Sequence, residues 1–346
     1  MLLALYLLVL SPSLCVPLRL CASALRQGTL RGQVVNGTAG GGPTASLAVT
    51  LRAFRGDQES QRLAATADAL GQFHFAHLET DADWAYQVQV TYQGVTYSGG
   101  VLSFAAGQDE IATEIAVYET TDSAERIGIE RAHILITPSD RDREASAGLS
   151  VAEFYVFANP TDRTYVGTQE MEGRRWVSRF SLPPGSHDLA FDDGAPGGRF
   201  LAVEGGFVDT GPLWPGSTRV LFSYVLDCPA GDCDLSRQIL YPIANLNVLL
   251  PDAGMQVAGS QLTLEGRREA QGQRYLNYAG HDLAPGGMLD LHVRLSPVPS
   301  LLAPSSLGDA RALLWIILGS LAAALVLAYP FWQQRRISQA AAQGKE

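Results

Sequence analysis

The sequence predicts an all-β protein with one transmembrane helix near its C-terminal end. Hydrophobic residues alternate with polar residues over short runs, and these runs are separated by turns rich in glycine and proline (35 and 18 of 346 residues). No stretch between residues 24 and 312 keeps a helical period over several turns. A third observation, the uncharged run over residues 312–332, predicts the helix.

Residues 1–24 are predicted to form a secretory signal peptide. The chain begins with an apolar run that is too short to span a bilayer, and Ala22-Ser23-Ala24 has the pattern of a signal peptidase site. The start lacks the basic residue that such peptides usually carry. Lipidation at Cys15 or Cys21 is the alternative, but neither is preceded by a small residue.

The first predicted domain covers residues 28–119 and is a sandwich of seven strands. Leu47, Val49 and Leu51 fall on one face of a strand, and Phe73 and Phe75 share a face of another. Between them, Gly71 supplies the positive φ that a tight turn needs.

A family resemblance rests on two elements of this domain. The first is the strand Gly32-Gln33-Val34, which leads into an Asn36-Gly37 turn. The second is the motif Thr66-x-Asp68-x-x-Gly71-x-Phe73-x-Phe75. Together they resemble the carboxypeptidase regulatory-like family, which implies a transthyretin-like or starch-binding-like sandwich with a binding or spacer role. The family accompanies peptidases and is not itself a peptidase, and this chain contains no His-x-x-Glu zinc pair.

A polar linker over residues 120–126 is predicted to lead into a second β-sandwich region, residues 127–298. In this region, residues such as Ile134, Phe222 and Val248 are predicted to lie on hydrophobic strand faces. Residues 288–295 show the most regular alternation of hydrophobic and polar residues and are predicted to form one strand. The region is either one large sandwich or two small immunoglobulin-like ones divided near residues 228–236. Residues 299–311 are predicted to form a second linker.

The predicted transmembrane helix has the length and flanks of a membrane anchor. At about 1.5 Å per residue, residues 312–332 span roughly 31 Å, close to the hydrocarbon thickness of a bilayer. Trp315, Tyr329 and Trp332 lie near its ends, and Arg335 and Arg336 follow it. By the positive-inside rule the tail, residues 333–346, is cytoplasmic and the domains lie outside the cytoplasm.

Several functional classes are not supported by the sequence. A net charge of −10 argues against nucleic acid as a partner. The chain has no Gly-x-Ser-x-Gly elbow and no Gly-x-x-x-x-Gly-Lys phosphate loop. Asp192, Asp193 and Asp209 lack the spacing of an EF-type calcium loop. We therefore predict no catalytic residue, no cofactor and no metal site.

Cys228 and Cys233 are predicted to form a disulfide that closes a short loop. They lie close together in a chain predicted to be exported, where thiols pair. The alternatives are a redox-active pair, or a metal site completed by nearby aspartates. A metal shared by His74 and His77 is a weaker hypothesis, because positions three apart on a strand point to opposite faces.

Trp84, Tyr92 and Tyr97 are the candidate ligand-binding residues. They are expected near loops of the first domain, where their rings could stack on sugars; the alternative is that they are ordinary core or strand-face aromatic residues.

From these features we predict a non-enzymatic membrane protein with an interaction or scaffolding role in the cell envelope, with an envelope protein or a glycan as partner. The basic residues other than Lys345 are arginines, which hints at a bacterial source. The alternatives are carbohydrate binding and an accessory role in redox or metal handling.

Overall fold

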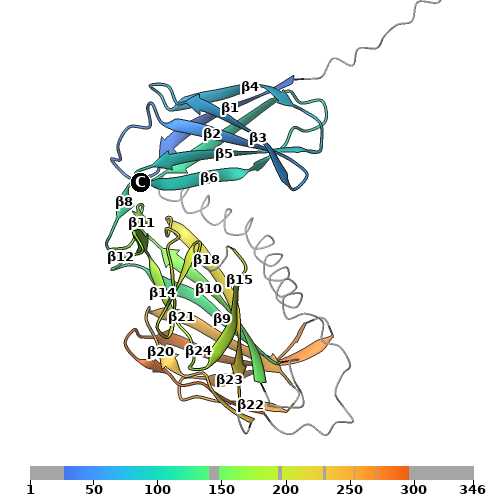
Figure 1. Ribbon diagram of the computed structural model, residues 1–346, viewed down its shortest axis with the longest axis vertical. Coiled ribbons are helices and arrows are strands. Elements are labelled where there is room, and N and C mark those ends of the chain that lie inside the picture. The colour runs from blue at the N-terminus through green and yellow to red at the C-terminus, as the bar shows by residue number, and fades with distance from the viewer. Residues whose placement is uncertain are drawn as a thin grey trace, which may run out of the picture. The chain divides into compact units, whose positions relative to one another are not determined.

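The computed structural model describes residues 27–139, 148–193, 197–228, 231–252, 254–270 and 272–295, and every regular element in them is a β-strand (Figure 1). The all-β prediction is therefore confirmed for this part of the chain. These residues form two compact units: 27–35 with 43–116, and 36–42 with 117–295. The predicted signal peptide (1–24), second linker (299–311), transmembrane helix (312–332) and tail (333–346) lie outside the described residues. Among those described, no helix has the length and apolarity to cross a membrane.

The first unit contains seven strands in two sheets, as the sequence predicts. Neighbouring strands are antiparallel wherever their register is defined. The three-stranded sheet has the order β4 (Gln72–Glu79), β1 (Gln27–Asn36), β7 (Glu110–Val117). The four-stranded sheet has the order β3 (Gln58–Thr66), β2 (Ala48–Arg55), β5 (Trp84–Tyr92), β6 (Val95–Leu102).

The alternation of the sequence places one face of each sheet in the core of this unit. Val49, Leu51, Phe73 and Phe75 are buried, as predicted from their spacing. Gly32 is required by packing, because a Cβ atom there would lie 2.2 Å from the ring of Phe73. Residues at the intervening positions face outward and line the outer faces of the two sheets.

The motif around Asp68 builds the turn between β3 and β4. The Oδ1 atom of Asp68 accepts hydrogen bonds from the backbone amides of Leu70 and Gln72, each at 2.8 Å. Gly71 has a φ of 76°, and a Cβ atom there would lie 2.5 Å from the carbonyl oxygen of Val34. Aspartate and glycine at these positions are therefore explained by turn geometry, without a ligand.

The second unit is organised around one seven-stranded mixed sheet. β9 and β21 pair in parallel and all other neighbours in the sheet are antiparallel. The parallel pair joins the N-terminal and C-terminal halves of the unit into one sheet. Its order is β15 (Ser186–Phe191), β18 (Gly216–Asp227), β10 (Gly148–Asn159), β9 (Gly128–Pro138), β21 (Ile243–Pro251), β24 (Gln273–Leu283), β23 (Thr263–Ala270).

Shorter strands form the remaining sheets of this unit. Two are three-stranded: β14 (Ser178–Ser181), β17 (Gly206–Asp209), β16 (Phe200–Val203), and β19 (Asp232–Asp234), β26 (His292–Leu295), β22 (Met255–Ala258). Three are two-stranded: β20 (Arg237–Gln238) with β25 (Met288–Leu289), β11 (Thr164–Tyr165) with β8 (Thr120–Thr121), and β12 (Gln169–Met171) with β13 (Arg174–Trp176).

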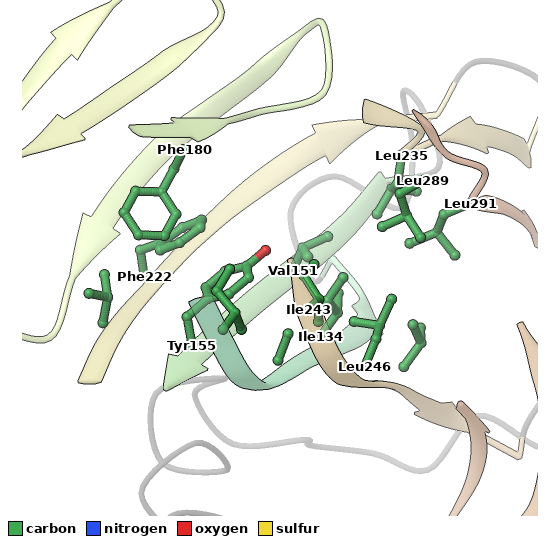
Figure 2. Packing of buried hydrophobic residues seen from close by; sticks show 14 of the residues in the cluster. Ile134, Val151, Tyr155, Phe180, Phe222, Leu235, Ile243, Leu246, Leu289 and Leu291 are labelled. Carbon is green, nitrogen blue, oxygen red and sulfur yellow. The ribbon is translucent and has the colours of Figure 1, made fainter. Parts of the chain in front are cut away.

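One hydrophobic core joins the large sheet to these shorter strands. Ile134, Val151 and Leu246 of the large sheet belong to the same buried cluster as Phe180 of β14 and Leu289 of β25 (Figure 2). The cluster contains residues from both sides of positions 228–236. Within the described residues, one core therefore joins strands from both sides of these positions.

Two predicted boundaries differ from the structure. Thr120–Thr121, predicted to be linker, forms strand β8, which pairs in parallel with β11. The single strand predicted over residues 288–295 is divided between β25 and β26, which lie in different sheets. The division occurs because the amides of Asp290 and Leu291 donate to the side chains of Gln261 (3.0 Å) and Ser236 (3.1 Å) instead of to a neighbouring strand.

Candidate functional site

An open groove on the first unit is a concave surface that could hold a ligand. It has a volume of about 760 Å³, within the range of ligand-binding clefts. It lies over the outer face of the sheet β4-β1-β7 and is bounded on one side by the end of β3 and the Asp68 turn. Its lining includes Arg31, Gln33, Thr66, Gln72, His74 and Glu114.

Strand register brings these polar side chains together. Arg31 lies opposite His74 and Gln33 lies opposite Gln72 across the β1–β4 pair, all at outward-facing positions. β7 contributes Glu114 from the other side of β1. Residues from three strands therefore form one polar surface that no local sequence motif marks.

The groove offers charged, imidazole and amide groups and no exposed Phe, Tyr or Trp ring. The Nε atom of Arg31 pairs with Glu110 at 2.9 Å, with both side chains more than half exposed. The Nε2 atom of Gln33 donates to the carbonyl oxygen of Leu70 at 3.0 Å. The ring of Phe73 packs over Gly32 in the core. The surface is thus suited to hydrogen bonds and ion pairs, and lacks a platform for stacking a sugar ring.

The structure does not bring the three predicted aromatic residues to one surface. Trp84 and Tyr92 stand at opposite ends of β5, roughly 26 Å apart at about 3.3 Å per residue. Tyr97 is buried in the core of the unit. Trp84 stacks on Tyr86 with ring centroids 6.5 Å apart. As placed, these residues do not form a shared stacking platform.

Cys228 and Cys233 are joined by a disulfide, with their Cα atoms 5.0 Å apart. Both residues are buried within the core cluster of the second unit. Cys233 lies on β19, which pairs with β26. The bond therefore ties the end of β18 to the short strand that follows it.

No metal site is formed by the histidines and acidic residues whose positions the structure describes. No three such groups, cysteines included, converge on one point in this part of the chain. His74 and His77 both belong to β4, and the Nδ1 atom of His77 lies 2.5 Å from Oε1 of Gln27.

A buried polar cluster lies in the core of the second unit, on the face of β10 that is otherwise hydrophobic. The Glu153 side chain is fully buried, and its carboxylate pairs with Arg237 at 2.7 and 2.8 Å. The hydroxyls of Tyr155 and Tyr224 donate to the same carboxylate at 2.6 and 2.7 Å. Burial raises the pKa of both tyrosines. Burial alone would lower the pKa of Arg237, but the interactions with Glu153, Tyr155 and Tyr224 together outweigh burial and raise that pKa.

These groups satisfy one another, because each carboxylate oxygen of Glu153 accepts from Arg237 and from one tyrosine. The cavity beside Tyr155 and Arg237 has a volume of about 40 Å³, room for one or two water molecules. The cluster is therefore explained as a structural centre that fixes β10, β18 and β20 relative to one another.

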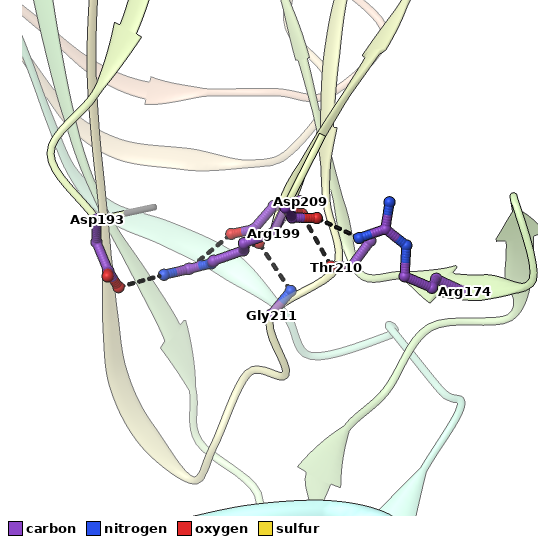
Figure 3. A network of polar contacts seen from close by, with 7 residues as sticks. Arg174, Asp193, Arg199, Asp209, Thr210 and Gly211 are labelled. Atoms are coloured by element: carbon purple, nitrogen blue, oxygen red, sulfur yellow. Dashed lines mark hydrogen bonds and ion pairs between the residues drawn. The ribbon is translucent and has the colours of Figure 1, made fainter. Parts of the chain in front are cut away.

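Asp209 belongs to a second polar network, which Figure 3 shows. Its buried carboxylate accepts two hydrogen bonds from Arg199, both 2.7 Å long, and one from the amide of Gly211. Arg199 also pairs with Asp193 at 3.0 Å. Burial alone would lower the pKa of the Arg199 guanidinium, but the hydrogen bonds to Asp209 and Asp193 and the charges of these two residues together outweigh burial and raise that pKa. Asp193 and Asp209 are therefore joined through Arg199 in one ion-pair network.

Comparison with known proteins identifies no family. No model of a known protein family matches the chain, and no curated protein matches it. Among solved structures, the full-length major pilin SpaD from Corynebacterium diphtheriae matches with 10% sequence identity, over 80% of this chain and 84% of that chain, at a TM-score of 0.23. A TM-score of this size does not establish a common arrangement of the two chains. The described residues form an all-β, multi-sandwich protein, and the resemblance to the carboxypeptidase regulatory-like family stays a prediction.

Proposed function

We propose that this chain is a non-enzymatic interaction protein of the cell envelope, anchored by residues 312–332, whose first unit binds an extended segment of a partner protein. The observation that carries the proposal is the groove over β4-β1-β7. It is open, its lining comes from three strands of the sheet, and it carries both Arg31 and Glu114. A protein segment with charged side chains can form ion pairs with Arg31 and Glu114, and the groove offers no Phe, Tyr or Trp ring on its surface for a sugar to stack on.

The location outside the cytoplasm is supported by the disulfide. Disulfides persist in oxidising compartments and are rare in the cytosol. The bond between Cys228 and Cys233 fits the predicted signal peptide and the predicted orientation of the anchor.

A photo-crosslinking amino acid at Gln33 tests the groove directly. Gln33 is exposed and lines the groove, whereas Thr91 is exposed on the outer face of the other sheet and serves as the matched control position. We expect irradiation of intact cells to give a discrete protein adduct from position 33 and none from position 91.

A charge reversal in the groove completes this experiment. Glu114→Arg changes an exposed side chain, so it should alter the free energy of unfolding by less than about 0.5 kcal/mol. We expect it to reduce the adduct at position 33 at least five-fold. Equal adducts from positions 33 and 91, or an adduct that Glu114→Arg leaves unchanged, would contradict the proposal. A saccharide in place of a protein in the adduct would favour the glycan alternative.

A further inference from the structure

The edge strand β6 in the first unit carries no charged residue. Its sequence, Val-Thr-Tyr-Ser-Gly-Gly-Val-Leu, also lacks proline, and it is the last strand of its sheet. Exposed edges of this kind pair readily with other strands, and proteins usually protect them with charges or proline. Each of the other edge strands described in this unit has such charges: Glu59 and Arg62 on β3, Glu79 on β4, Glu110 and Glu114 on β7.

The hairpin geometry shows which backbone groups of β6 face away from its own sheet. The loop between β5 and β6 has two residues, Gln93 and Gly94, with φ values of 48° and 78°, and Tyr92 pairs with Val95. In such a hairpin the closing pair is hydrogen bonded and the bonding alternates along the strands. Val95 and Tyr97 therefore bond to β5, while the amides and carbonyls of Thr96 and Ser98 point to the open edge.

This edge is accessible over a short flat stretch. Thr96 and Ser98 are both exposed. A register shift opposite Gln87–Gln89 places a bulge at Gly99–Gly100 and ends the flat stretch there. Beyond the bulge, Val101 is 67% exposed, which makes it one of the most exposed large hydrophobic residues described.

We propose that two copies of this chain associate by antiparallel pairing of β6 with β6 of the partner subunit. In the proposed register Thr96 lies opposite Ser98 of the partner subunit, so the backbone amides and carbonyls of both residues on each strand bond to the other strand. This pairing continues the four-stranded sheet of one copy into that of the other.

An uncharged strand can pair with its own copy without repulsion, and charge selects β6 over the other described edges of this unit as the site. At a net charge of −10, two copies repel one another over most of their surfaces. At β6 the two identical strands bring no like charges together. Antiparallel self-pairing of β7 about its centre would instead place Glu110 opposite Glu114 of the partner subunit. The twofold pairing also closes the assembly at two copies.

Cysteine substitutions test the register in the full-length chain in its own membrane. A hydrogen-bonded antiparallel pair has Cα atoms about 5.5 Å apart, within the range that a disulfide bridges. Chains carrying Thr96→Cys and chains carrying Ser98→Cys, with different tags, are co-expressed and oxidised. We expect a crosslinked heterodimer at least ten-fold more abundant than the crosslinked product of either variant alone. No crosslink, or equal crosslinking by Thr96→Cys alone, would overturn the proposed pairing.

Paired lysine substitutions test the association without relying on crosslinking. Thr96→Lys with Ser98→Lys puts charges on the open edge, whereas Gln89→Lys with Thr91→Lys puts the same charges on the same sheet face one strand further in. By mass measurement in detergent, we expect the unchanged chain and the Gln89/Thr91 variant to be dimers and the Thr96/Ser98 variant to be a monomer. A monomeric unchanged chain, or a Thr96/Ser98 variant that stays dimeric, would overturn the inference.

Discussion

Arg237→Met is expected to destabilise the second unit by about 3–5 kcal/mol, because it leaves the charge of Glu153 buried without its partner. Glu153 is fully buried and Arg237 is 8% exposed, so water cannot replace the lost ion pair. The tyrosine hydroxyls that remain on the carboxylate supply hydrogen bonds but no opposite charge. Equilibrium unfolding of the purified full chain in denaturant measures the effect.

Two comparisons separate the loss of the pair from a general effect of substitution. Replacing both residues, Glu153→Met with Arg237→Met, removes the unpaired charge and is expected to cost less than Arg237→Met alone. Arg175→Met in the same unit breaks an exposed pair with Glu170 and should cost less than about 1 kcal/mol. A cost for Arg237→Met as small as that for Arg175→Met would show that the buried pair is not formed.

Phe222→Ala is expected to cost about 3–5 kcal/mol, the usual range for removing a buried ring. The side chain is 1% exposed, and its ring centroid lies 4.8 Å from that of Phe207 and 5.4 Å from that of Phe180. It therefore links the large sheet to β14 and β17. Denaturant unfolding followed by far-UV circular dichroism measures the loss, with Leu264→Ala, at a half-exposed position of the same unit, as the control.

The shape of that unfolding curve also tests the single core. Because one cluster contains residues from both halves of the second unit, this unit should unfold in one cooperative transition that Phe222→Ala shifts as a whole. Two transitions from the second unit, only one of them sensitive to Phe222→Ala, would mean that it consists of two independent sandwiches.

The strands that were predictable from the sequence are those with one buried face. Val220, Phe222, Tyr224 and Leu226 alternate with less buried residues on β18, and all four are buried. By contrast, β3 and β23 lie at sheet edges and are mostly polar, so they show little alternation. Their pairing depends on backbone hydrogen bonds to a neighbouring strand, which a pattern of side chains does not record.

The candidate site was less predictable than the fold. The groove combines residues from β1, β4 and β7 that are far apart in sequence, and each of them alone has the ordinary composition of an outward-facing strand position. The buried pair did leave a signal, since Glu153 occupies a core-facing position between Val151 and Tyr155. Its partner Arg237 lies on a two-residue strand with no pattern of its own.

Whether the two sandwich units lie outside the cytoplasm is decided by the oxidation state of Cys228 and Cys233 in the cell. Cells are lysed in denaturant with an alkylating reagent and without reductant, and the peptide containing both residues is analysed by mass spectrometry. We expect an unalkylated peptide that takes up two alkyl groups only after reduction. A peptide that carries both alkyl groups before reduction would contradict a location outside the cytoplasm.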